Sequence, residues 1–214
     1  LDRGRTLNIR HIRAGPSVNS GKLEGGLNRL CTYGSTLSVA SSQSMAATSV
    51  ATASNVSLQT SIAHQVNIVV SYGNLALWDG GNTTNHGNAT VDGGSGIWAA
   101  QSTGDNSNWT DQTGASNGAW VNDQFVVYAG NAGTVSVQDT KSGQSANVII
   151  NGMQFANNDG KSYLITGDDV YAATNSTTIR VGDGTTAGAS ISAIFDTVLN
   201  DQLVSGGTSL VKTD

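Results

Sequence analysis

The chain has 214 residues, of which 95 are Gly, Ser, Thr or Asn and only 12% are charged. Its net charge is −5 at neutral pH, and a single Glu accompanies 14 Asp residues. Strong helix formers are scarce and Pro occurs once, so the composition argues against a helical bundle and against the Pro-, Glu- and Lys-rich chains that stay disordered. It predicts an all-β fold with many turns.

Residues 1–70 are expected to form an irregular N-terminal segment that is leader-like or poorly ordered. Residues 1–30 carry six of the ten basic residues, and this head is either a leader or unstructured arm or a contact for RNA or an anionic surface. Residues 36–54 are rich in small residues, as is typical of the end of a secretory leader. The remaining chain lacks clustered Lys and Arg, so no nucleic-acid partner is expected for it. Cys31 is the only cysteine, which excludes an intramolecular disulfide and a Cys-based zinc site.

Residues 71–120 are expected to form a Trp-rich N-terminal cap. All four tryptophans of the chain lie here, in Gly-, Asn- and Asp-rich surroundings. Two interpretations stay open for them. In the first, Trp98, Trp109 and Trp120 form an exposed platform on which sugars stack. In the second, the tryptophans fill and cover the end of the β-structure.

Residues 121–214 are expected to form the first coils of a β-helix. Eight short apolar clusters recur about every ten residues between turn residues, a spacing that suits a sandwich, a barrel or a solenoid. A solenoid is favoured because Gly, Asn and Asp supply its corners and Ser, Thr and Asn can stack into ladders. The clusters are Phe125–Tyr128, Val135–Val137, Val148–Ile150, Tyr163–Ile165, Val170–Tyr171, Ile179–Val181, Ile191–Phe195 and Leu210–Val211.

Two glycine-containing motifs invite a catalytic or cofactor reading, and both lack the required context. Gly114-Ala115-Ser116-Asn117-Gly118 matches the G-x-S-x-G of a hydrolase nucleophile elbow, but no buried strand and helix flank it. The stretch Gly182–Gly188 is similar to a dinucleotide-binding loop, but no helix pattern follows. We interpret both as turns and expect no cofactor.

The Asp-rich turns offer oxygen ligands, but no known calcium motif is present. The candidate ligands are Asp168, Asp169 and Asp183 in one group and Asp92, Asp105 and Asp111 in another. Asp168-Asp169 is also the only adjacent pair of acids, with Arg180 as the one nearby basic residue for a polysaccharide-cleaving site. Neighbours in a strand point to opposite faces, which argues against such a pair. No metal and no catalytic residue are therefore assigned.

A series of short motifs runs through two thirds of the chain: Trp78-Asp79-Gly80-Gly81, Gly96-Ile97-Trp98, Asn106-Ser107-Asn108-Trp109-Thr110-Asp111, Asn117-Gly118-Ala119-Trp120, Ala129-Gly130-Asn131-Ala132-Gly133-Thr134-Val135-Ser136-Val137, Gly152-Met153-Gln154-Phe155, Tyr163-Leu164-Ile165-Thr166-Gly167 and Gly207-Thr208-Ser209-Leu210-Val211-Lys212-Thr213. As an ordered series, these motifs resemble the opening of passenger regions in bacterial autotransporters with autotransporter-associated β-strand repeats. The resemblance covers roughly residues 75–213.

The resemblance implies a right-handed parallel β-helix passenger, located at the bacterial cell surface, on the outer membrane or secreted. It implies a non-enzymatic adhesin or self-associating protein whose partners are a host surface or neighbouring cells, together with its own C-terminal β-barrel outside this chain. Two alternatives remain open. One is a carbohydrate-binding β module that uses Trp98, Trp109 and Trp120, and the other is a polysaccharide-cleaving β-helix enzyme.

Overall fold

The computed structural model describes residues 25–35, 37, 55–71, 73–100, 107–141, 144–157, 159–174, 176–201 and 209–213. Most of the predicted leader stretch, the basic residues before position 25, Asp105, Gly207 and Thr208 lie outside the described residues. The described part consists of strands, turns and short 3-10 structure such as η2 (Gly188–Ser190), with no α-helix. The all-β class predicted from composition is confirmed.

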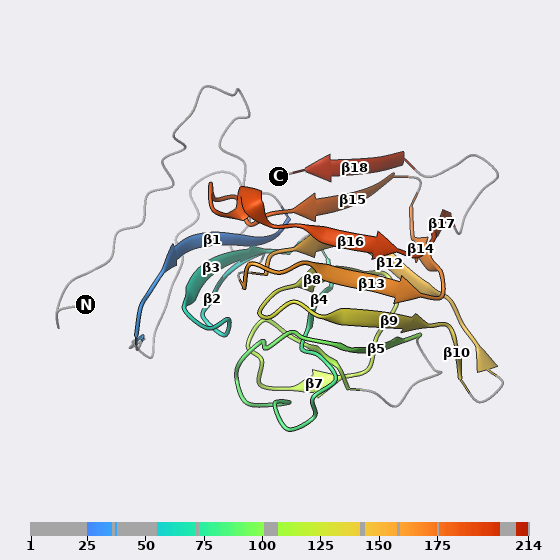
Figure 1. The fold of residues 1–214 in the computed structure, drawn as a ribbon, viewed down its shortest axis with the longest axis horizontal. Helices are drawn as coiled ribbons and strands as arrows, with labels where there is room; N and C mark the ends of the chain where they lie inside the picture. The colour runs from blue at the N-terminus through green and yellow to red at the C-terminus, as the bar shows by residue number, and fades with distance from the viewer. Residues whose placement is uncertain are drawn as a thin grey trace.

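The first sheet is built on a ladder of parallel strands that are far apart in sequence (Figure 1). Each strand of the ladder pairs with the next: β4 (Leu75–Trp78), β8 (Gln124–Tyr128), β12 (Val148–Phe155), β15 (Ser176–Val181) and β18 (Ser209–Thr213). Two short strands continue the sheet beside the start of β12, namely β14 (Val170–Ala172) and β17 (Leu199–Asp201). Beyond β4 the sheet ends in two antiparallel strands, β6 (Trp109–Thr110) and β7 (Asn117–Gly118).

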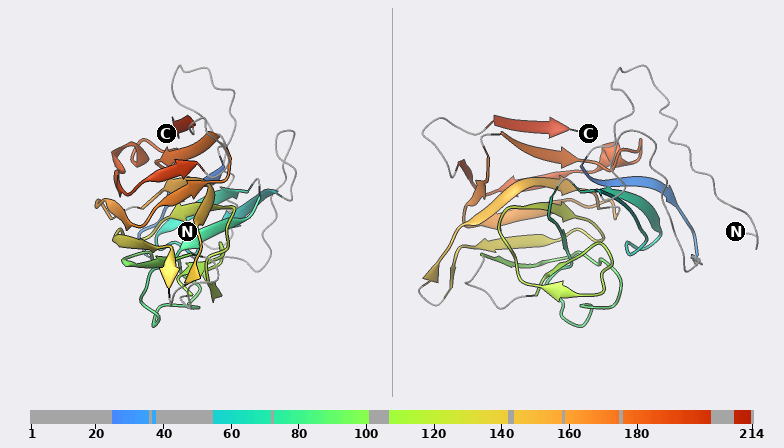
Figure 2. Two further views of the ribbon diagram at one scale, coloured as in Figure 1. Left: turned by 90° about the vertical axis from the view of Figure 1, so that its right-hand side faces the viewer. Right: turned by 180° about the vertical axis from the view of Figure 1, so that it is seen from behind.

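The second sheet stacks four parallel strands in the order of the chain: β5 (Gly96–Ala99), β9 (Thr134–Gln138), β13 (Tyr163–Gly167) and β16 (Ala193–Asp196). Thr134, Leu164 and Ile194 are direct partners across three of these strands, so the chain returns to the same register after 30 residues in each step. The view along the strands in Figure 2 shows the two sheets facing each other. Neither sheet closes on itself, so the fold is not a barrel.

The main core fills the space between the two sheets. Val135 and Val137 on β9 are buried, while Thr134 at the start of β9 is exposed, which is the alternation expected for a strand with one face inward. All eight apolar clusters predicted from the sequence lie in strands or overlap them. Seventeen buried residues from both sheets form one continuous apolar cluster.

The corners between strands depend on residues that tolerate unusual backbone angles. Gly130, directly after β8 and Ala129, has φ of 66°, and a Cβ there would overlap the carbonyl of Asp92. The next residue, Asn131, donates its backbone N–H to the same carbonyl at 2.9 Å. Glycine at this corner therefore lets two successive turns approach each other closely.

The N-terminal part of the described chain forms a third, antiparallel sheet in the order β1-β3-β2. Its strands are β1 (Gly26–Thr32), β2 (Val56–Gln59) and β3 (Gln65–Val70), none of which was predicted from the sequence. The sheet covers the outer face of the first sheet, where Leu27, Ile62 and Val69 pack with Leu77 and Val127 (Figure 2). It thus gives the first sheet a second buried face.

Smaller features complete the description. A two-stranded hairpin, β10 (Thr140–Lys141) and β11 (Gln144–Ser145), projects from one end of the molecule (Figure 1). In the part of the chain that the structure describes, no helix is long and apolar enough to cross a membrane.

Candidate functional site

The four tryptophans form one cluster at the β4 and β5 end of the two sheets. Trp78 lies on β4, Trp98 on β5 and Trp109 on β6, while Trp120 precedes β8. The centroids of neighbouring indole rings are 4.9 to 5.1 Å apart, mostly in edge-to-face or tilted arrangements. Such geometry is favourable for aromatic pairs beyond the apolar area that they bury. Tyr128 packs beside three of these rings and leads into the main core.

The predicted site residues Trp98, Trp109 and Trp120 are therefore brought together, but their rings face inward. Each is at most 3% exposed. Trp120 donates its indole N–H to Asn122 at 2.8 Å, whereas the indole nitrogens of Trp98 and Trp109 have no hydrogen-bond partner among the described residues. Sugar stacking on these three rings stays a prediction, and it now requires the cluster to open.

The two glycine-containing motifs form turns. Ser116 lies between the short strands β6 and β7, and its carbonyl accepts a hydrogen bond from Thr110. Gly182 follows β15, and the 3-10 helix η2 that comes next has only three residues. Neither arrangement provides the strand-to-helix turn that a nucleophile elbow or a dinucleotide-binding loop needs.

The candidate calcium ligands do not gather around one point. Asp168 accepts the backbone N–H of Asp139, Asp169 accepts from Asn200, and Asp183 forms an ion pair with Arg29. Asp111 accepts two hydrogen bonds from Thr113 within its own turn. In the described ranges, no group of three His, Cys, Asp or Glu side chains is arranged to hold a metal ion.

Asp79 is a buried carboxyl for which the sequence alone predicted no role. Its two oxygens accept the backbone N–H of Asp92 at 2.8 Å and the side-chain amide of Asn117 at 2.7 Å. Burial is the main cause that raises the pKa of Asp79 above its ordinary value, and these two hydrogen bonds oppose the shift. Because Asp92 lies in the loop before β5 and Asn117 lies on β7, Asp79 ties together separate segments beside the tryptophan cluster. An Asp directly after a strand and before two glycines was the only local signal.

The outward face of the second sheet carries the most exposed large apolar side chains on a regular strand. Ile97 on β5 is 42% exposed and Ile194 on β16 is 55% exposed. Leu164, the direct partner of Ile194 on β13, is half-buried. These three residues, which we call the outer apolar face, are accessible to another molecule in the described structure.

A comparison with known proteins identifies a relative. The chain is 42% identical over 163 residues to the Adhesin BmaC autotransporter of Brucella suis biovar 1 (strain 1330). The chain is similar to a segment of an autotransporter adhesin. The match covers 73% of this chain and 4% of that protein. No protein-family model matches the chain, and no solved structure matches it.

The match confirms the resemblance to autotransporter passenger regions that the ordered motifs predicted. It also supports the predicted location on the outer membrane, at the cell surface or outside the cell. The chain spans 4% of the length of this autotransporter adhesin, and the match supports a surface adhesin-type autotransporter passenger as the kind of protein to which such a segment belongs.

Proposed function

We propose that the chain forms successive coils of a right-handed parallel β-helix that acts as a rigid segment of a surface-displayed adhesin. The observation that carries this proposal is the 30-residue step between Thr134, Leu164 and Ile194, which are paired in parallel on three neighbouring strands. A chain that returns to the same register with a constant step builds a rod in which each coil contacts its neighbours.

Side chains at the corners support the same arrangement. Ser162 contacts Ser192 through their hydroxyl groups, 30 residues apart. Thr197 donates to the carbonyl of Asp168 at 2.7 Å, 29 residues away. Hydrogen bonds between equivalent corners of successive coils stiffen a solenoid without disulfides.

We propose further that residues 71–120 cap the N-terminal end of this rod and that residues 121–214 are its first coils. The antiparallel strands β6 and β7 cover the edge of β4, and Asn108 donates to the carbonyl of Ile97 on β5. The buried tryptophans fill the interior at the same end. Capping elements of this kind protect the open end of a stack from water and from pairing with other strands. The prediction that residues 1–70 are leader-like stays a prediction.

The proposed use of the rod is non-enzymatic adhesion or self-association, with a host surface or neighbouring cells as partner. The outer apolar face offers accessible contact area on a rigid sheet, and rigidity lowers the entropy lost on binding. The relationship to an autotransporter adhesin points to the same use.

Adhesion can be tested by displaying the chain on a non-adherent bacterium through an outer-membrane anchor. We expect the displayed chain to increase attachment to host-cell monolayers or clumping of the bacteria. Ile194→Ser should reduce that increase several-fold, because it removes the most exposed apolar side chain of the outer apolar face. Thr134→Ser, two strands away on the same row, is the matched control and should leave attachment unchanged. Equal attachment with and without the displayed chain would contradict the proposal.

A further inference from the structure

The outer face of the first sheet changes from apolar to polar along one row of paired residues. Leu77 on β4 pairs with Val127 on β8, which pairs with Gln154 on β12, which pairs with Arg180 on β15. All four side chains are at most 2% exposed, because the β1-β3-β2 sheet lies over them. The β1-β3-β2 sheet therefore contacts apolar side chains on β4 and β8 and hydrogen-bonding side chains on β12 and β15.

Gln154 binds β1 as a neighbouring strand would. Its side-chain oxygen accepts the backbone N–H of Leu27 at 2.7 Å, and its amide nitrogen donates to the carbonyl of the same residue at 2.9 Å. The amide nitrogen also donates to the carbonyl of Gly182 at 2.8 Å. Both N–H groups of the Gln154 amide are thus used. Its side chain makes the two hydrogen bonds to the edge of β1 that a neighbouring strand would make.

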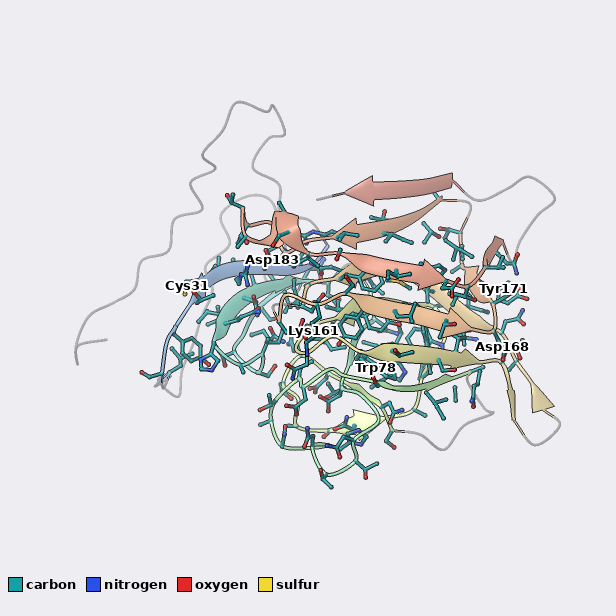
Figure 3. The ribbon with its side chains drawn as sticks, viewed as in Figure 1. Cys31, Trp78, Lys161, Asp168, Tyr171 and Asp183 are labelled. Carbon is teal, nitrogen blue, oxygen red and sulfur yellow. The ribbon has the colours of Figure 1, made fainter. Side chains whose placement is uncertain are left out.

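Two arginines extend this contact to β15 and the turn that follows it. Arg180 donates to the carbonyl of Leu27 at 2.9 Å and to the side-chain oxygen of Asn28 at 3.1 Å. From β1, Arg29 forms an ion pair with Asp183 at 2.8 Å, and its backbone N–H donates to the Asp183 carbonyl at 3.0 Å. The labelled Asp183 in Figure 3 lies beside β1, at the end of β15. Residues about 150 positions apart in sequence are therefore joined by buried polar contacts.

The β1-β3-β2 sheet has its own backbone ladder and shares none with the two parallel sheets. Its removal would leave every parallel strand paired as before, whereas Leu77 and Val127 would lose their cover. The contacts of Gln154 with β1, by contrast, require β12 to be in place, and those of Arg180 require β15. The polar part of the closure thus depends on strands that come much later in the chain than the apolar packing on Leu77 and Val127.

We propose that the β1-β3-β2 sheet is a strap that closes over the first sheet only once β12 and β15 are stacked, and that Gln154 and Arg180 are the clasp that holds it shut. The strap opens as one unit while the parallel ladders remain intact. Opening exposes the apolar row of Leu77 and Val127, and closure buries it. This role goes beyond adhesion and does not depend on it.

A pair of glycines allows the clasp to be broken without removing a polar group. Gly26 lies at the start of β1 with φ of 95°, and a Cβ there would overlap the side-chain oxygen of Gln154. Gly34, two residues beyond β1, has no atom within 4 Å of the corresponding Cβ position. Gly26→Ala therefore targets the clasp, and Gly34→Ala is the same change at a position with free space.

Hydrogen exchange followed by mass spectrometry on the full chain tests the strap. In Gly26→Ala we expect amides of β1, β2 and β3 to exchange roughly tenfold faster or more, because buried hydrogen bonds are lost. Amides of β9 and β13 should keep the wild-type rate, and Gly34→Ala should match the wild type throughout. Equal acceleration in β9 and β13 would show that the molecule opens as a whole, and an unchanged β1 would show that the clasp does not hold it. Either result overturns the proposal.

A second variant and a titration keep the test decisive if Gly26→Ala does not fold. Gln154→Met preserves side-chain length and removes the amide, and we expect the same selective acceleration in the strap. In wild-type protein, strap amides should begin to exchange at a lower urea concentration than those of β9 and β13. Coincident onset in all strands would overturn the strap.

Discussion

Two regions of the molecule are held together by different contacts. One is the interior between the two parallel sheets, and the other is the contact of the strap with the first sheet, which we call the seam. The interior is apolar throughout the main cluster, and its parallel strands pair at sequence separations from 22 residues, between Val148 and Val170, to 50 residues, between Leu75 and Phe125. At the seam, β1 is joined to β12 and β15 mainly by Gln154, Arg180 and the Arg29–Asp183 ion pair. The parallel sheets therefore depend on a periodic local pattern, whereas the seam combines apolar packing on β4 and β8 with a few individual polar side chains on β12, β15 and the turn after β15.

This difference predicts two kinds of mutational response. Truncation of an interior side chain leaves a cavity that weakens both sheets together. Loss of one seam partner leaves a buried polar group without its contact and weakens only the attachment of the strap. The following changes distinguish the two responses, beginning with the largest expected effect.

Trp109→Ala should lower the free energy of unfolding by about 4 kcal/mol, since a buried aromatic ring is removed from the centre of its cluster. Urea denaturation followed by circular dichroism measures this loss. Val121→Ala, at a side chain that is 47% exposed, is the control and should change stability by less than about 0.5 kcal/mol. A small effect of Trp109→Ala would mean that the tryptophan cluster does not stabilise the β4 and β5 end of the two sheets.

Asp183→Ala should weaken closure of the strap by about 3 kcal/mol, because it leaves Arg29 buried without its ionic partner. Exchange rates of β1 amides, compared with those of β13, measure the effect. Arg29→Ala and the double variant complete a mutant cycle, in which the double variant should cost less than the sum of the single changes. Additive costs would show that the ion pair does not couple β1 to β15.

The contrast between interior and seam also explains how much of the molecule was predictable. Strands such as β9 follow from local alternation, because Val135 and Val137 point inward and their neighbours do not. The seam has no such local signal: Asp183 reads as a turn residue, and its partner Arg29 belongs to the basic N-terminal residues.

The tryptophans were recognised as the informative group, but their orientation could not be predicted. Whether Trp98 faces sugar or core depends on how β5, β6 and the turn before β8 pack together. Those contacts join separate strands and loops, so no pattern within one segment encodes them. The strand β3 was missed because Gln65 and Asn67 place polar side chains on one of its buried faces.

Asp79→Asn tests the contrast between interior and seam, because Asp79 is a buried polar group beside the apolar tryptophan cluster. Its raised pKa means that its contribution to stability is fully present below the ordinary value of 3.8 and is lost as the pH rises through the folded pKa. The wild type should therefore lose stability relative to the variant across that window and no further above it. At neutral pH the variant should be about 1 kcal/mol less stable, since an Asn amide cannot accept from both Asp92 and Asn117. Denaturation at a series of pH values measures both effects, and a pH-independent difference would contradict the assignment.

Ser162→Ala tests the smallest contribution, that of the exposed corner contact with Ser192. We expect less than about 0.5 kcal/mol, because water replaces an exposed hydrogen bond at little cost. Ser192→Ala and the double variant should behave alike, as measured by urea denaturation. A loss above about 1 kcal/mol would mean that the corner ladders stabilise the stack to a degree similar to a buried hydrogen bond. Individual polar side chains would then stabilise the whole rod. The contacts of the strap would differ from those of the parallel sheets only in the sequence separation of the residues that they join.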